Sequence, residues 1–194
     1  MIETDGIHKR GQALENEYFQ RVDQELLHNM RLEEEREQNL KELTEATGLH
    51  DGVVAGHLLD AGIDATNVAA LTLTPLVFVA WASGSVSAEE RQGVISAALR
   101  RGVSSNATAF RLLEQWLQTR PKRQLWELWK EYAAALHGSL PSASADKLRE
   151  RLVAQAKVVA MASGGFMGVG KVCPAEQRVL DEMNEVLSHR TPAE

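Results

Sequence analysis

The chain has 194 residues, a net charge of −6 and a hydrophobic content of 44%. This length and composition allow one large domain, or a domain with an extension, and exclude a wholly disordered chain. The acidic balance argues against a general nucleic-acid binder. The one cysteine, Cys173, excludes an internal disulfide and fits a reducing compartment.

The first residues of the chain and its most apolar run both favour a cytoplasmic location. Residues 1–5 lack the basic-then-apolar pattern of a secretory signal. The most apolar run, residues 68–82, is too short for a comfortable membrane span and contains Pro75. We therefore predict no transmembrane segment and read this run as a buried helix.

The first predicted element is a long helix over residues 9–47, which we call the N-terminal arm when residues 1–8 are included. The N-terminal arm (residues 1–47) holds 12 acidic and 6 basic side chains. Apolar residues recur at helical spacing in its first half, and a polar run follows at 33–39. Because such a stripe needs a surface to cover it, we predict a partner or a second copy there. The predicted contact residues are Tyr18, Phe19, Val22, Leu26 and Met30.

Residues 48–194 form the second predicted domain, and they read as helices throughout. Glycines at 48, 62, 84 and 102 are expected to end helices, whereas Pro121 and Pro174 are expected to start them. Pro75 is expected to kink the helix that contains it. No convincing strand pattern is present, so the fold class is all-α. The helices are predicted over 51–62, 66–84, 88–102, 106–117, 121–138, 144–164 and 174–187.

One short phrase occurs twice in this domain. Val79–Gly84 leads into Ala88–Arg91, and Val159–Gly164 leads into Ala175–Arg178. Each copy reads as an apolar helix that ends at glycine, followed by a loop and a helix with acidic residues in its first turn. Ser87 with Glu90 is a capping-box pattern. The duplication predicts two equivalent helix–loop–helix halves.

The repeated phrase resembles the tellurite-resistance TerB-like family of all-helical domains, over residues 71–98 and 156–187. The resemblance implies a helical bundle with an internal pseudo-two-fold repeat, its halves at about 64–138 and 144–190. It also implies an interaction role linked to stress response or to membrane-associated complexes. Family members carry acidic residues near these loops that are thought to bind divalent metal.

Carried over by position, the implied metal ligands are Glu89, Glu90 and Glu176. The chain departs from the family at Ser83 and Ser163, where the family favours aspartate before glycine. Two good ligands for a hard cation are therefore missing. The alternative is that the three glutamates only complement the positive ends of their helices. If metal binds, calcium or magnesium is expected, because neither loop has a thiolate or imidazole.

A glycine-rich loop over residues 165–172 interrupts the second copy. It resembles a phosphate-binding loop, but Val172 stands where serine or threonine should hold magnesium, and only one helix follows. We therefore interpret it as an inserted loop. Its Phe166 and Met167 are candidate partner contacts.

Glu25 and His28 form a Glu-x-x-His pair of the type found in di-iron carboxylate bundles. Such sites need a second pair, and none occurs in this chain. A second copy could supply it across a symmetry axis. Otherwise His28 is a solvent-exposed or interface histidine.

Three tryptophans, Trp116, Trp126 and Trp129, lie within the basic segment 100–130. Aromatic and basic residues together can bind single-stranded nucleic acid, but tryptophans at helical spacing are more typical of a core. We favour the core, and nucleic-acid binding is not expected. No catalytic triad or Cys-His pair is recognisable.

Taken together, the residues and the resemblance predict a non-catalytic cytoplasmic interaction or scaffold protein. It would self-associate as a homo-oligomer through the N-terminal arm and need no cofactor. The first alternative is a calcium or magnesium sensor that uses Glu89, Glu90 and Glu176. The second is a di-iron enzyme assembled across an oligomer through Glu25 and His28.

Overall fold

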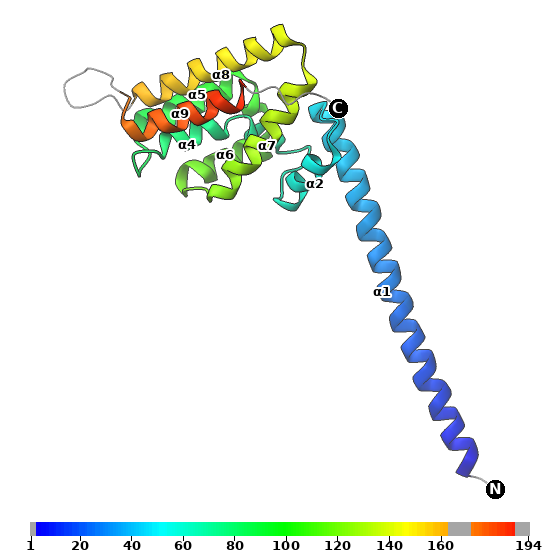
Figure 1. Cartoon of the computed structure of the whole chain (residues 1–194). Helices are drawn as coiled ribbons and strands as arrows, with labels where there is room; N and C mark the ends of the chain where they lie inside the picture. Colours follow the sequence, from blue (N-terminus) through cyan, green and yellow to red (C-terminus); the bar gives the residue numbers. More distant parts are fainter. Residues whose placement is uncertain (1–2, 163–171, 189–194) are drawn as a thin grey trace. The chain divides into compact units, whose positions relative to one another are not determined.

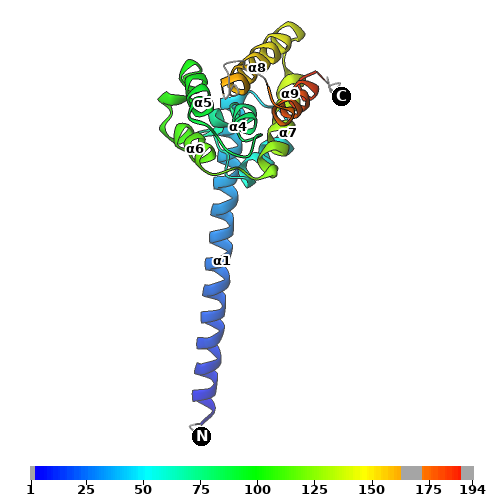
Figure 2. The same ribbon diagram turned by 90° about the vertical axis from the view of Figure 1, so that its left-hand side faces the viewer.

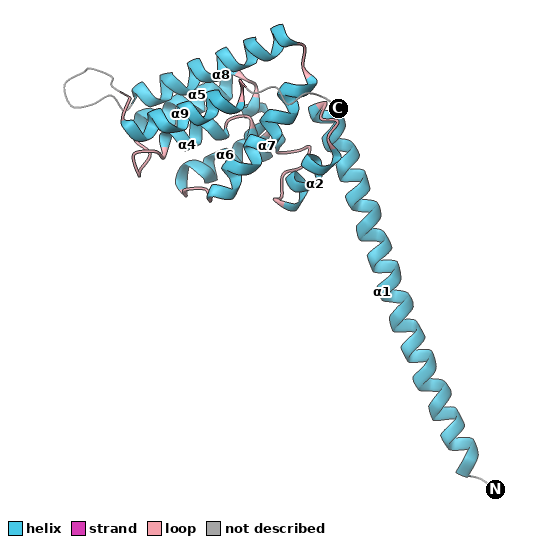
Figure 3. Ribbon diagram, viewed as in Figure 1, coloured by secondary structure: helices cyan, strands magenta, loops and turns pink. Residues whose placement is uncertain are grey.

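The computed structural model describes residues 3–162 and 172–188, with side chains from Tyr18 onward in those ranges. All regular structure in these ranges is helical, as Figure 3 shows, which confirms the all-α class. The elements are α1 (Glu3–Thr47), α2 (Gly52–Asp60), α3 (Val68–Leu71), α4 (Thr74–Ala80), α5 (Ala88–Arg100), η1 (Val103–Ser105), α6 (Ala107–Gln118), α7 (Arg123–Ser139), α8 (Ser142–Ala162) and α9 (Pro174–Val186).

The chain divides into two units between Asn39 and Leu40, inside α1. The described part of the N-terminal unit (residues 1–39) is a single helix from Glu3, and every described side chain from Tyr18 to Asn39 is exposed. The last part of α1 belongs to the C-terminal unit (residues 40–194), because Leu43 is fully buried and Leu40 packs against the core. The unit boundary therefore falls before Thr47, the end predicted for the N-terminal arm.

Helix α4 lies at the centre of the C-terminal unit. Six of its seven residues are buried, and it packs against α5, α7, α8 and α9. Figure 2 shows α5 and α6 on one side of α4, and α7, α8 and α9 on the other. An apolar helix without a polar face is stable only when it is covered all round. The residues predicted as a buried helix thus form the middle of the core.

The prediction of one kinked helix over residues 66–84 is wrong, because this segment forms two helices. Helix α3 ends at Leu71, and α4 starts at Thr74 with Pro75 in its first turn. Proline lacks an N–H and fits the first turn, where that group has no intrahelical partner. The proline therefore opens a new helix.

The glycine predictions are confirmed at the helix ends that the structure describes. Gly48, Gly62, Gly84 and Gly102 all have positive φ, between 67° and 106°. This left-handed conformation costs glycine little because it has no Cβ. The predicted start at Pro174 is also confirmed. The predicted start at Pro121 is wrong, because α7 begins at Arg123 after its N-cap Lys122; α7 also continues past Gly138 to Ser139, and α8 starts at Ser142.

The three tryptophans of the basic segment belong to the core, as predicted. Trp126 and Trp129 are each 1% exposed, and their rings stack with centroids 4.8 Å apart. Trp116 is 9% exposed, and its carbonyl accepts a hydrogen bond from the indole of Trp81 at 2.8 Å. Within the described ranges, no helix combines the length and the apolar character needed to cross a membrane.

Candidate functional site

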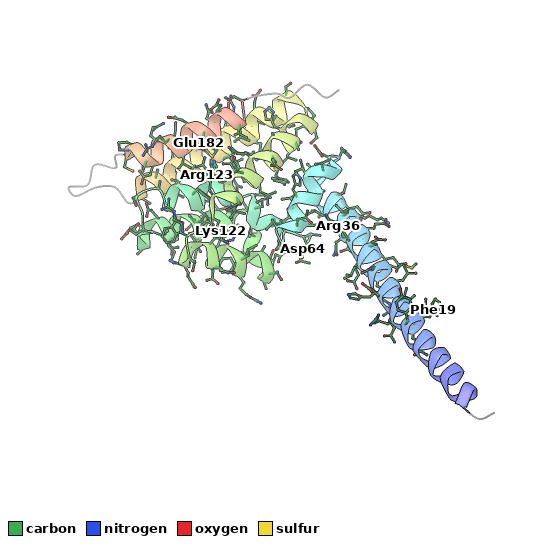
Figure 4. All side chains as sticks on the ribbon, turned by 60° about the horizontal axis from the view of Figure 1, so that its bottom comes forward. Phe19, Arg36, Asp64, Lys122, Arg123 and Glu182 are labelled. Atoms are coloured by element: carbon green, nitrogen blue, oxygen red, sulfur yellow. The ribbon has the colours of Figure 1, made fainter. Side chains whose placement is uncertain are left out.

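Most of the exposed large hydrophobic side chains among the described residues lie on α1. Seven large hydrophobic side chains are exposed there: Tyr18, Phe19, Val22, Leu26, Leu27, Met30 and Leu32. The first residues of this set carry further contacts, since the Tyr18 and Phe19 rings meet edge to face and Arg21 lies over the Tyr18 ring. Figure 4 labels Phe19 on this helix. The five predicted contact residues are all in the set.

Four of these residues follow one another at four-residue steps: Tyr18, Val22, Leu26 and Met30. We call these four residues the row, and it lies at the centre of the exposed apolar surface of α1. Each step of four residues turns the row by about 40° around a regular helix. The row therefore winds slowly, and Phe19 widens it on one edge. Leu27, which is 52% exposed, lies far around the helix from Val22 but only three residues before Met30, so it flanks one end of the row.

The repeated helix starts have the same local geometry in both copies. At α5, the Ser87 hydroxyl accepts a hydrogen bond from the Glu90 N–H at 3.1 Å, and the Glu90 carboxylate accepts one from the Ser87 N–H at 2.7 Å. At α9, Cys173 Sγ accepts from the Glu176 N–H at 3.4 Å, and the Glu176 carboxylate accepts from the Cys173 N–H at 2.6 Å. Each helix thus begins with a capping box.

Two of the three implied metal ligands are the buried members of these capping boxes. Glu90 is 1% exposed and Glu176 is 2% exposed, whereas Glu89 is on the surface. One oxygen of Glu90, Oε1, is buried and accepts no hydrogen bond from any described residue. Among the described residues, no three His, Cys, Asp or Glu side chains are grouped so as to hold a metal ion.

The other predicted site residues are separate from these helix starts. Glu25 and His28 are exposed on α1. That a second copy supplies the other Glu-x-x-His pair of a di-iron site stays a prediction. Phe166 and Met167 lie outside the described residues, as does Ser163. Ser83 is exposed, and its hydroxyl donates to the Ser85 carbonyl at 3.1 Å.

A network of polar side chains joins α7 to α9. Glu182 accepts hydrogen bonds from the Trp126 indole at 2.7 Å and from Arg123 at 3.0 Å. Figure 4 shows Arg123 and Glu182 beside one another. Arg123 also pairs with Glu127, whose pKa is lowered chiefly by its hydrogen bond with Lys130. These groups position helices and form a solvated surface.

Several hollows among the described residues were not predicted from the sequence. A groove of about 920 Å³ lies between α2 and the α6–α7 connection, and within it His57 Nδ1 lies 2.8 Å from Glu131 Oε2. A smaller cavity of about 420 Å³ lies where α7 and α8 face each other. We call the second one the α7–α8 cavity. The sequence feature that could have indicated this cavity is the helical spacing of four residues on one face of α8: Leu148, Arg151, Leu152 and Gln155.

Comparison with known proteins gave no match: no protein-family model, curated protein or solved structure is significantly similar to the chain.

Proposed function

We propose that this protein is a non-catalytic interaction or scaffold protein that self-associates through the N-terminal arm. The observation that carries the proposal is the exposed row Tyr18, Val22, Leu26 and Met30. Contiguous apolar surface of this kind marks interaction sites, and an amphipathic helix is read by its partner through residues at such spacing. The single cysteine supports a reducing, cytoplasmic setting.

We commit to a second copy of the chain as the partner, in an antiparallel arrangement centred on Val22. In that register, Tyr18 of one copy lies opposite Leu26 of the other, Val22 meets Val22, and Met30 falls at the level of Leu14, so apolar positions face each other across the two-fold axis. Arg21 and Glu25 lie on the same edge of the row, and the antiparallel register brings each near the other in the second copy. Like-sized apolar groups and opposite charges therefore meet.

The acidic run at 33–37 favours the antiparallel over the parallel arrangement. A parallel pair would set the glutamates of both copies side by side, because equal residue numbers then share one level. An antiparallel pair centred on Val22 separates the two Glu33 positions by roughly 33 Å, since a helix rises 1.5 Å per residue. That distance is several Debye lengths at physiological salt, so the repulsion is screened.

The test compares two substitutions to glutamate on the same helix, one in the row and one on the opposite face. Leu26→Glu places a charge in the row and is expected to give a monomer, whereas Gln24→Glu places the same charge at an exposed position on the opposite face and keeps the dimer. Sedimentation velocity over a range of concentrations measures both. A monomeric wild-type chain, or equal effects of the two variants, would show that the row does not mediate self-association.

Disulfide trapping tests the orientation. In a Cys173→Ser background, Tyr18→Cys and Leu26→Cys chains are mixed and oxidised mildly. The antiparallel arrangement predicts a mixed dimer of the two variants. Cross-linking of Tyr18→Cys with itself in place of the mixed product would establish a parallel pair instead.

We propose further that the C-terminal unit has a TerB-like architecture with a pseudo-two-fold repeat. The capping boxes of α5 and α9 support this, and so does the packing, in which α4 contacts α9 as α8 contacts α5. The α4–α5 connection and the start of α9 also lie at the same end of the unit, on the left of Figure 1. A link to stress response rests on the resemblance of the repeated phrase alone.

Divalent-cation binding is a second candidate function, and one observation favours it. The buried Glu90 Oε1 accepts no hydrogen bond from a described residue, and hard cations prefer such carboxylate oxygens. If calcium or magnesium binds there, millimolar amounts will raise the melting temperature of the wild-type chain and leave that of Glu90→Gln unchanged. An equal response of the two proteins, or none in either, rules this site out.

A further inference from the structure

The α7–α8 cavity has the size and the walls of a small-molecule site. Its volume of about 420 Å³ lies within the range usual for ligand pockets. One wall is the face of α7 that carries Trp129 and Ala133, and the opposite wall is the face of α8 that carries Leu148 and Leu152. Leu187, at the end of α9, closes one side. These walls are apolar.

Three arginines line the same cavity: Arg100 and Arg101 at the end of α5, and Arg151 on α8. No aspartate or glutamate is among the lining residues. None of the three arginines forms an ion pair with a described residue. The cavity therefore combines apolar walls with three positive charges that the described part of the chain does not neutralise.

Arg101 is the most enclosed of the three. Its guanidinium donates to the Thr72 carbonyl at 3.2 Å and to the side-chain oxygen of Gln155, which are both neutral acceptors. Burial lowers the pKa of Arg101, since removing a cation from water is costly. A guanidinium has five N–H donors, so three remain after these two bonds. The two hydrogen bonds help to hold the neighbouring helices in place. The three remaining N–H donors and the positive charge of Arg101 are available to an anion.

Tyr132 adds a hydroxyl to the cavity. The residue is 6% exposed and lines the cavity, and no described residue forms a hydrogen bond with its hydroxyl. The hydroxyl is not among the buried polar atoms that lack a partner, so it is accessible from the cavity and free to donate or accept there. A ligand in the cavity could therefore form a hydrogen bond with Tyr132 in place of water.

We propose that the α7–α8 cavity binds an amphiphilic anion, with its carboxylate or phosphate head at Arg100, Arg101 and Arg151 and its apolar body between α7 and α8. Arginine suits this role because its planar donors pair with two oxygens of either head group. The body replaces water along the leucine and tryptophan walls. This inference concerns the C-terminal unit and is independent of self-association through the N-terminal arm.

Isothermal titration calorimetry of the full-length protein tests the proposal with decanoate, decyl phosphate, decanol and acetate. Decanoate or decyl phosphate should bind with one site per chain, and the tighter of the two identifies the head group. Decanol lacks the charge and acetate lacks the chain, so each should bind at least about tenfold more weakly, as expected for a lost charged hydrogen bond or a lost apolar contact. Decanol binding as tight as the anions would overturn the proposal, as would no binding by either anion.

Variants locate the binding site. Arg151→Gln removes a charge from an exposed position on the cavity wall and should weaken binding of the anion by about tenfold. Lys157→Gln removes the same charge from the same helix outside the cavity and should leave binding unchanged. Leu148→Trp, at a partly buried position, should fill the space and block the anion. Equal affinities of the Arg151→Gln and Lys157→Gln variants would refute the assignment.

Discussion

At the scale of single residues, the buried glutamates Glu90 and Glu176 show how a helix start can hold a charge inside a protein. Each carboxylate accepts a short hydrogen bond from a backbone N–H that would otherwise lack a partner. The positive end of the helix favours the same charge. Both glutamates therefore have a structural role in capping, whether or not a cation also binds.

The two capping boxes differ at one atom, and this difference gives a stability prediction. Ser87 accepts through oxygen at 3.1 Å, whereas Cys173 accepts through sulfur at 3.4 Å. Because sulfur is the weaker acceptor, Cys173→Ser should raise the free energy of unfolding. Ser87→Ala should lower it by about 1 kcal/mol. Urea unfolding measures both, and a loss of stability in Cys173→Ser would contradict the prediction.

Tyr132 predicts how stability depends on alkaline pH. Burial raises the pKa of its phenol in the folded state, whereas the unfolded chain loses this proton near pH 10. The neutral phenol therefore supports folding fully below about pH 10, and this contribution is lost as pH rises through the folded-state pKa.

Urea unfolding at pH 9 and pH 11 checks the prediction. The wild-type chain should lose more stability between these pH values than Tyr132→Phe does. Tyr18→Phe is the matched control, because Tyr18 is 55% exposed and is the chain's other tyrosine. Parallel losses in wild type and Tyr132→Phe would show that the Tyr132 phenol does not carry the effect.

At the scale of helices, the contact between α7 and α9 depends on Glu182. This side chain accepts from the Trp126 indole, which is nearly inaccessible to water, and from the exposed Arg123. Glu182→Ala leaves the indole N–H without its acceptor, and we expect a loss of about 1–3 kcal/mol. The pair with Arg123 adds little, since exposed ion pairs are weak.

Glu182→Gln separates these two contributions, because its amide oxygen can still accept from Trp126. It should lose less stability than Glu182→Ala in chemical unfolding, and tryptophan fluorescence should stay closer to that of the wild-type chain. If both variants lose the same free energy of unfolding, the charge of Glu182 and not its hydrogen bond with the Trp126 indole provides the stabilisation.

At the scale of the whole chain, two truncations test whether the unit boundary lies at Asn39 or at Thr47, the end of α1. Deleting residues 1–39 removes exposed helix and should leave the C-terminal unit folded, without self-association. Deleting residues 1–47 also removes Leu43, which is fully buried. Loss of a buried leucine typically costs 2–5 kcal/mol, so the shorter chain should be markedly less stable. Thermal unfolding of both checks this, and equal stability would place the boundary after Thr47.

Helices, their caps and the core tryptophans were predictable because they depend on nearby residues. Helical spacing identified α1, α5, α6 and α9, and left-handed glycines ended four segments as predicted. The Ser87–Glu90 capping box was also predicted from four consecutive residues. Pro75 was misread because a proline within an apolar run permits a kink or a new start, and only packing around α4 selects between them.

The sequence by itself determined the all-α class, most helix ends and the apolar row on α1, because each depends on contacts within a few residues or on one helical face. Tertiary structure alone decided the unit boundary at Asn39 and the α7–α8 cavity. Both depend on side chains that are distant along the chain: Leu43 is buried by the core, and Arg101 meets Gln155 from another helix. Local patterns set which face of a helix is apolar, but the assembled core determines what that face covers.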